Sequence, residues 1–130
     1  MKHLRIYESY RGDKVIKLYN NSILYDYQVD VEESTKRIVE TKNKILTLIN
    51  EYINMNSDYF LEKYGYLVAT LKIKNFEFYI DKTPSLSLCY SYAILANPED
   101  NIYLKYKDIE DLLNFMKDPD LYRSMKKYNI

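Results

Sequence analysis

The chain of 130 residues has one cysteine, one histidine, two glycines and no tryptophan. With Cys89 alone, no disulfide can form within the chain, and a thiolate zinc site would need a cysteine from another chain. His3 is the only imidazole, so a Ser/His/Asp or Cys/His nucleophilic site would have to use it. With glycine only at Gly12 and Gly65, no glycine-rich loop can hold phosphate groups. We therefore predict no catalytic residues, no cofactor and no enzymatic activity.

Long apolar runs and acidic clusters with metal-ligand spacing are missing too. No segment approaches about 18 uninterrupted apolar residues, the length that spans a bilayer, and the N-terminus lacks the apolar centre of a signal peptide. The acidic runs within 26–33, 99–100 and 108–111 match no calcium-binding loop. We therefore expect no metal site and no membrane partner. We also expect the chain to lie in the cytoplasm, where a lone cysteine stays reduced.

The net charge is zero, because 19 basic residues balance 19 acidic ones. The balance also holds locally, since residues 1–29, 30–65, 66–95 and 96–130 each carry nearly equal numbers of the two signs. A protein held on DNA or RNA by phosphate contacts usually carries a basic block. The even distribution therefore disfavours direct nucleic-acid binding.

Tyrosine is in excess, with 16 copies. Codon bias explains much of this excess, since tyrosine, isoleucine, lysine and asparagine are all favoured in AT-rich genomes. Tyrosine is also enriched in surfaces that bind other proteins. AT-rich coding indicates a low-GC bacterium or one of its mobile elements.

The strongest periodic pattern covers residues 31–55. Its apolar residues recur at helical spacing and form one stripe: Val31, Ile38, Ile45, Leu48, Ile49, Tyr52, Ile53 and Met55. Asp30, with Glu33 three positions on, has the pattern of a capping box, and opposite charges four residues apart mark the solvent side. The pattern predicts one amphipathic helix of about six or seven turns.

The residues before this helix alternate between apolar and polar, which favours strands. We predict strands over 2–10, 14–19 and 22–29. They would be joined by a turn at 11–13, where Gly12 can supply a positive φ, and by another at 20–21. Tyr25 and Tyr27 share a strand face with apolar residues, so we expect both to be buried. The sequence thus predicts an N-terminal antiparallel β-meander.

The second half is typical of a short helix, a sheet and two further helices. A helix over 58–64 would end at Gly65. Strands are expected over 66–73, 76–80, 85–96 and 101–107, with a turn at Lys74-Asn75 between the first two. Asp108 and Asp118 would begin the last two helices. The final helix would bury three residues: Leu121, Met125 and Tyr128.

Together these elements predict the α+β class. The expected order is an N-terminal antiparallel β-meander, a long amphipathic helix at about 31–55, a second antiparallel sheet at about 66–107 and two short C-terminal helices. The length suits a single compact domain over 1–130, with 1–65 and 66–130 as an alternative substructure. A chain of this size buries roughly two thirds of its extended-chain surface.

Four residues of the predicted meander are candidates for binding: Tyr7, Arg11, Lys17 and Tyr19. The two tyrosines share strand faces with charged residues, so we expect them to be exposed beside the arginine and the lysine. Exposed tyrosine and arginine side chains often anchor protein–protein interfaces. The same face could also stack nucleic-acid bases on its tyrosine rings.

Without a catalytic constellation, the sequence favours a small, non-enzymatic protein-binding module. Its composition is typical of a phage or mobile-element inhibitor, an anti-CRISPR-like protein that docks on a larger host nucleoprotein or enzyme in the host cytoplasm. The alternative is a nucleic-acid-binding accessory protein that uses the Tyr/Arg/Lys sheet face. A homodimer, formed through a bare sheet edge or a helix face, is a further possibility. No motif identifies a family.

Overall fold

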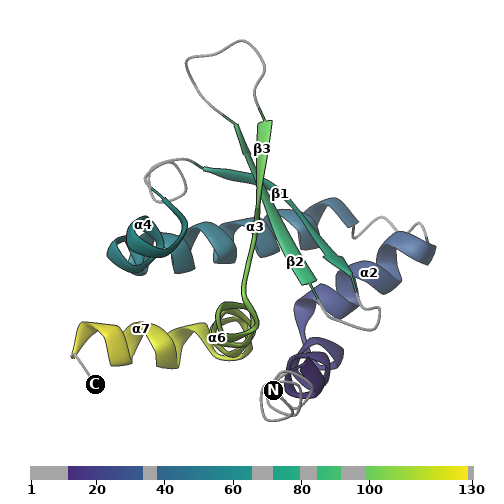
Figure 1. Ribbon diagram of the computed structural model, residues 1–130. Coiled ribbons are helices and arrows are strands. Elements are labelled where there is room, and N and C mark those ends of the chain that lie inside the picture. The colour runs from purple at the N-terminus through teal and green to yellow at the C-terminus, as the bar shows by residue number, and fades with distance from the viewer. Residues whose placement is uncertain (1–11, 34–37, 66–71, 80–84, 92–98, 129–130) are drawn as a thin grey trace, which may run out of the picture.

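The computed structural model describes residues 12–33, 38–65, 72–79, 85–91 and 99–128, which form helices and one antiparallel sheet (Figure 1). Residues 12–20 are helical. The elements that follow are α2 (Ile23–Glu33), α3 (Ile38–Met55), α4 (Ser57–Tyr64), β1 (Ile73–Tyr79), β2 (Ser85–Ser91), β3 (Glu99–Tyr103), α6 (Tyr106–Lys117) and α7 (Pro119–Lys127). The α+β class expected from the sequence is confirmed, but the elements come in a different order.

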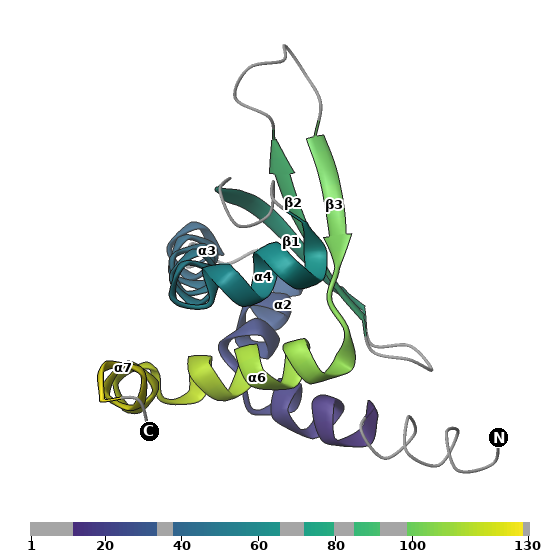
Figure 2. The same cartoon turned by 60° about the vertical axis from the view of Figure 1, so that its left-hand side comes forward.

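The sheet has the strand order β1-β2-β3, and both strand pairs are antiparallel. Phe76 pairs with Leu88, which pairs in turn with Ile102, and all three side chains are buried. The adjacent row across the strands is more polar and includes Asn75 and Asn101, which are both exposed. The helices gather on one side and at one end of the sheet (Figure 2). One sheet face is therefore apolar and packed against helices, and the other is polar.

The hydrophobic core lies between the apolar sheet face and the helices. Its most deeply buried side chains, each at most 2% exposed, are Val15, Leu24, Ile45, Ile49, Phe60, Ile73, Leu86, Leu88, Ile109, Leu112, Leu113 and Phe115. Burying one such side chain contributes about 1.5–3 kcal/mol, so this cluster is the main source of stability. The stripe residues predicted within 45–53 are all buried in α3.

The predicted N-terminal meander is wrong wherever the structure describes it. Residues 14–19 and 22–29, expected as strands, are helical except at Ser22, and Gly12 and Asp13, expected in a turn, are helical too. Residues 2–10 lie outside the described residues. Val15 and Tyr19, four residues apart, are both buried. In so short a segment the apolar residues fit either a strand or a helix, and packing against the rest of the core selects the helical spacing.

The helix predicted over 31–55 is in fact divided between two helices. α3 begins at Ile38, whereas Val31 belongs to α2, which begins at Ile23; residues 34–37 lie outside the described part of the chain. Val31 is 38% exposed, so it does not continue the buried stripe, which starts at Ile45. The seven-residue spacing that predicted one helix therefore includes an exposed residue of α2, Val31, together with the core residues of α3.

In the second half, β1 and β2 overlap the strands predicted over 76–80 and 85–96. Lys74 and Asn75 do not form a turn. Both lie within β1, where the register shifts between Ile73 and Asn75 and accommodates an extra residue as a bulge. The strand predicted over 101–107 is too long, because β3 ends at Tyr103 and α6 begins at Tyr106. Predictions for 66–71, 80–84 and 92–98 fall outside the described residues.

Two of the predicted helix ends are confirmed. Asp118 caps α7, since its Oδ1 accepts a hydrogen bond from the backbone N–H of Leu121 at 3.1 Å. Gly65 ends α4 with a φ of 104°, a conformation that favours glycine. Asp108, in contrast, is not a cap. Helix α6 begins two residues earlier, at Tyr106, and the Asp108 side chain is buried.

The buried side of α7 is not the predicted one. The three residues expected in the core are exposed: Leu121, Met125 and Tyr128. Tyr122 is instead the packed residue, with its ring centroid 5.8 Å from that of Tyr52 and 5.2 Å from that of Phe115. The predicted face and the face that carries Tyr122 both fit a helix. The aromatic partners of Tyr122 on α3 and α6 determine which of the two faces points inward.

Candidate protein-binding groove

The four predicted binding residues do not form one exposed patch in the structure. Tyr7 and Arg11 lie outside the described residues. Lys17 is exposed on the helix over 12–20. Tyr19 is only 3% exposed, and its ring stacks on that of Phe78 with the centroids 4.2 Å apart and the planes 3° from parallel. The expectation that Tyr19 is exposed is therefore wrong, because the residue forms part of the core.

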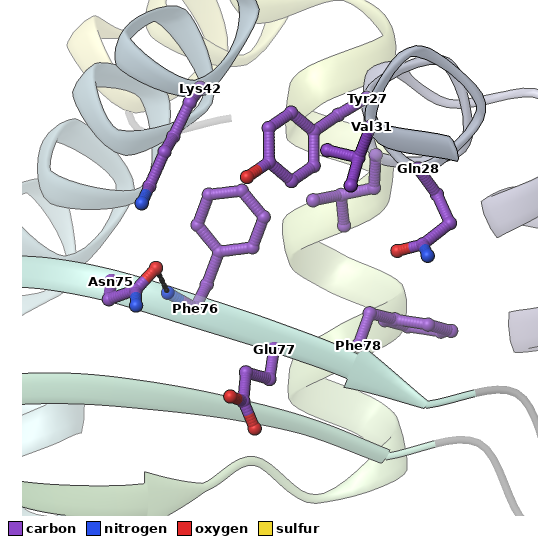
Figure 3. Close-up of a pocket in the computed structure, with 9 residues that line it drawn as sticks. Tyr27, Gln28, Val31, Lys42, Asn75, Phe76, Glu77 and Phe78 are labelled. Atoms are coloured by element: carbon purple, nitrogen blue, oxygen red, sulfur yellow. Dashed lines mark hydrogen bonds between the residues drawn. The ribbon is translucent and has the colours of Figure 1, made fainter. Parts of the chain in front are cut away.

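A groove of about 410 Å³ lies between α2 and β1 (Figure 3). Helix α2 contributes one face, with residues spaced i, i+3, i+4 and i+7: Leu24, Tyr27, Gln28 and Val31. Strand β1 contributes four consecutive residues, 75–78, and Lys42 reaches toward the groove from α3. A helix face and a strand edge thus form two roughly facing walls.

The α2/β1 groove has a mixed lining in which apolar and polar side chains stand side by side: Leu24, Tyr27, Val31, Phe76 and Phe78, with Gln28, Lys42, Asn75 and Glu77. The Tyr27 ring lies against that of Phe76, with centroids 5.3 Å apart. Val31 is 38% exposed, which is unusual for an aliphatic side chain that faces another element. Gln28 and Glu77 are exposed at the rim. Polar groups beside apolar side chains can fix the orientation of a ligand in such a groove.

A second groove, of about 610 Å³, carries the positive charge. Its rim includes Lys14 and Lys17 from the helix over 12–20 and Lys117 from α6, and its floor is apolar. The Lys14 ammonium forms an ion pair with Glu110 at 2.8 Å. This lysine groove is where the structure places Lys17, the one predicted binding residue that is exposed among the described residues.

A buried carboxylate joins α4 to α6. Asp108 is 1% exposed, and its Oδ1 accepts a hydrogen bond from the Tyr59 hydroxyl at 2.6 Å. The Tyr64 hydroxyl donates to the other carboxylate oxygen and accepts from the backbone N–H of Lys105 at 3.0 Å. The residues of this Asp108 cluster line neither of the two grooves. It therefore serves as a tie between helices.

The hydroxyls of the Asp108 cluster stay protonated at neutral pH. Burial first, and then the hydrogen bond to Asp108, raise the pKa of Tyr59 to about 12. The same two causes raise the pKa of Tyr64 above its ordinary value. Both phenols therefore act as hydrogen-bond donors to the carboxylate and not as bases.

Comparison of the chain with protein-family models, with curated proteins and with solved structures gives no match. Within the described ranges, no group of three or more His, Cys, Asp or Glu side chains is placed to hold a metal ion. In the same part of the chain, no helix is both long enough and apolar enough to cross a membrane.

The sequence contains a signal for the α2/β1 groove. Leu24, Tyr27 and Val31 have the spacing of one helix face, which a helical interpretation of 22–33 would have revealed. The competing alternation of Ile23, Tyr25, Tyr27 and Val29 favoured a strand. Tyr25, expected to be buried, is 42% exposed, while Tyr27 is partly buried against β1.

Proposed function

We propose that the chain is a protein-binding module that holds a segment of a partner protein in the α2/β1 groove. The observation that supports this function best is Val31, an exposed apolar residue in the groove wall on α2, which faces a strand and has polar groups around it. Burial of such a wall contributes binding free energy, and the surrounding polar groups orient the ligand. The groove follows β1 from residue 75 to 78, which spans about 10 Å at about 3.4 Å per residue. It therefore suits a short peptide segment.

The test compares two matched variants. Val31→Glu places a carboxylate on the groove wall, whereas Val39→Glu places one on α3, where Val39 is 66% exposed and lines neither groove. Peptides are first selected from a displayed random library on the unmodified protein. Binding of the selected peptides is then measured by fluorescence polarisation. Val31→Glu should weaken binding at least tenfold, since a desolvated charge in an apolar contact costs several kcal/mol.

Val39→Glu should bind the same peptides as tightly as the parent protein. Circular dichroism and thermal unfolding of both variants should match the parent, because both substitutions lie on exposed helix positions. Equal binding by the parent and by Val31→Glu would rule out this groove as the site.

The tyrosine-rich, charge-balanced composition supports a narrower form of the proposal. In this form the chain is a phage or mobile-element inhibitor that acts in the host cytoplasm by docking on a larger host protein or nucleoprotein. Expression of Val39→Glu should then raise the plating efficiency of a phage restricted by the host's nuclease or CRISPR system, and expression of Val31→Glu should not. No protection by the parent protein would dismiss the inhibitor role while leaving peptide binding intact.

The lysine groove supports nucleic-acid binding as the second candidate. The described part of the Tyr/Arg/Lys face predicted for this function is not a sheet, since Lys17 and Tyr19 lie on a helix. Lys14, Lys17 and Lys117 carry three positive charges, and Glu110 offsets one, which leaves two. So few phosphate contacts predict weak binding, with a log–log salt slope of roughly 2. Lys17→Gln should weaken DNA or RNA binding at low salt and Lys63→Gln, on α4, should not; absence of binding by the parent at low salt would remove this candidate.

A further inference from the structure

The register of the sheet determines which backbone groups of β1 face outward. In an antiparallel strand, the N–H and C=O of one residue point to the same side, and the side alternates along the strand. The N–H of Leu104 donates to the C=O of Leu86 at 3.0 Å, so the backbone of Leu86 faces the β3 side. Phe78 pairs with Leu86, and Phe76 pairs with Leu88 two residues further on. The backbone groups of Phe76 and Phe78 therefore point away from β2, toward the edge of β1 that no other described strand covers.

Two side-chain contacts agree with this assignment. At the start of β1, the N–H of Ile73 donates to Oδ1 of Asn50 at 2.8 Å, and its C=O accepts from Nδ2 of Asn50 at 3.1 Å. Asn50 thus occupies the place of a residue on a neighbouring strand. Further along, the N–H of Phe76 donates to Oδ1 of Asn75 at 2.9 Å (Figure 3). The outward amides at Ile73 and Phe76 are therefore satisfied by side chains.

The outward groups at the other end of β1 lie beside the α2/β1 groove. Among the described residues, no backbone or side-chain group bonds to the N–H or C=O of Phe78, or to the C=O of Phe76. Phe76 and Phe78 both line the groove. An edge strand with open N–H and C=O groups is a template for another extended chain.

We propose that the α2/β1 groove binds its partner by strand addition, with an extended segment of the partner protein paired to the free edge of β1. This inference rests on the proposed protein-binding function and specifies the ligand as an extended peptide. Its backbone would bond to the N–H and C=O of Phe78 and to the C=O of Phe76, and alternate side chains would enter the space between Tyr27 and Val31. A helix in the groove would leave these backbone groups unpaired. Lys42, at the α3 end of the groove, favours an acidic residue at that end of the peptide.

Amide hydrogen exchange tests this pairing directly. The parent protein is saturated with a selected groove-binding peptide, and exchange is followed residue by residue by NMR. The amide of Phe78 should exchange at least tenfold more slowly in the complex. The amide of Glu77, which points toward β2, should change much less and is the internal control.

The outcomes separate the inference from the function beneath it. If no peptide is selected, or if peptides bind Val31→Glu as tightly as the parent, the proposed function fails and strand addition fails with it. If binding depends on Val31 but the Phe78 amide is not protected, only strand addition is overturned. Protection of Phe78 that grows with protein concentration in the absence of peptide, together with dimers in sedimentation, would assign the edge to a second copy and overturn the peptide proposal.

A second variant tests the same edge by a gain of binding. Asn75→Ala removes the side chain that occupies the N–H of Phe76, so an added strand can accept this hydrogen bond as well. Peptide affinity should rise about fivefold, the effect of one net hydrogen bond. Asn114→Ala, at an exposed position on α6, should leave the affinity unchanged. Unchanged or weaker binding by Asn75→Ala would contradict strand addition at Phe76.

Discussion

Asn50 on α3 holds the backbone of Ile73 through two hydrogen bonds, at 2.8 and 3.1 Å, across 23 residues of sequence. The same amide nitrogen also donates to the C=O of Leu46 one turn earlier at 2.9 Å. One side chain therefore fixes the start of β1 against α3 and closes that end of the free sheet edge. Because the backbone of Ile73 is buried beneath this contact, its N–H and C=O depend on Asn50 for partners.

Replacement of Asn50 by alanine should destabilise the fold. The N–H and C=O of Ile73 would lose both partners in a partly buried site, which costs about 1–3 kcal/mol per unsatisfied group. We expect the free energy of unfolding in urea to fall by about 2–3 kcal/mol. Thr47→Ala, on the exposed side of the same helix, is the control and should change it by less than about 0.5 kcal/mol. Equal stability of the two variants would show that the Asn50 contact does not hold β1.

Helix α7 is anchored through Tyr122 and not through its neighbour Leu121. Tyr122→Ala should lower the free energy of unfolding by about 2–4 kcal/mol, because it removes the ring contacts with Tyr52 and Phe115. It also removes the hydrogen bond that the Tyr122 hydroxyl accepts from Asn56 at 3.0 Å. Leu121→Ala should change the stability little, since Leu121 is 57% exposed. Urea unfolding followed by circular dichroism measures both, and a larger effect at Leu121 would restore the inward face expected from the sequence.

Alkaline pH should destabilise the fold through the Asp108 cluster. The pKa of Tyr59 is about 12 in the folded chain, against an ordinary value of 10.0. The stability that this raised pKa represents is complete below pH 10, since both states are then protonated, and it is lost as the pH rises toward 12. Tyrosine ionisation should therefore leave the urea midpoint of unfolding unchanged up to about pH 9.5 and lower it steeply at higher pH.

The control for this pH effect removes the negative charge at position 108 and one of its two acceptor oxygens. Asp108→Asn should lower the pKa of Tyr59 toward its ordinary value, which absorbance at 295 nm records as earlier formation of tyrosinate. Burial remains, so the pKa should stay above 10. The variant should also lose about 1.5–3 kcal/mol of stability at neutral pH, the contribution of a hydrogen bond to a charged group. An unchanged titration would show that Asp108 does not influence Tyr59.

Parts of the fold were predictable because one pattern dominated locally. Within 45–53 the apolar residues fit a helix and nothing else, and the alternation within 85–91 fits only a strand. Asp118-Pro119 predicts a helix start for a physical reason. The aspartate side chain can accept a hydrogen bond from a free N–H of the first turn, and proline has no N–H that would stay unpaired there. At 14–29 the same residues satisfied both periods, and the strand interpretation was wrong. The choice there depends on β1, where Phe76 packs against Tyr27 and Phe78 stacks on Tyr19.

The candidate site was less predictable than the fold. Exposure of a tyrosine depends on its tertiary neighbours, so Tyr19 was placed on the surface although it is buried, and Val31 was placed in the core stripe although it lines a groove. A free strand edge is equally invisible in the sequence. Among the described residues it exists because the pairing of β1 with β2 turns Phe76 and Phe78 outward, and because Asn50 and Asn75 satisfy only part of that edge.

The sequence by itself determined the α+β class, the core stripe of α3, the end of α4 and the start of α7, because periodicity, capping and the glycine at 65 act within a few residues. Only the tertiary structure decided the helical state of 12–20 and 23–33, the inward face of α7 and the position of the α2/β1 groove. Each of these depends on contacts between residues far apart in the chain. Such contacts select between local patterns that have similar free energies, and a local pattern alone cannot reveal the selection.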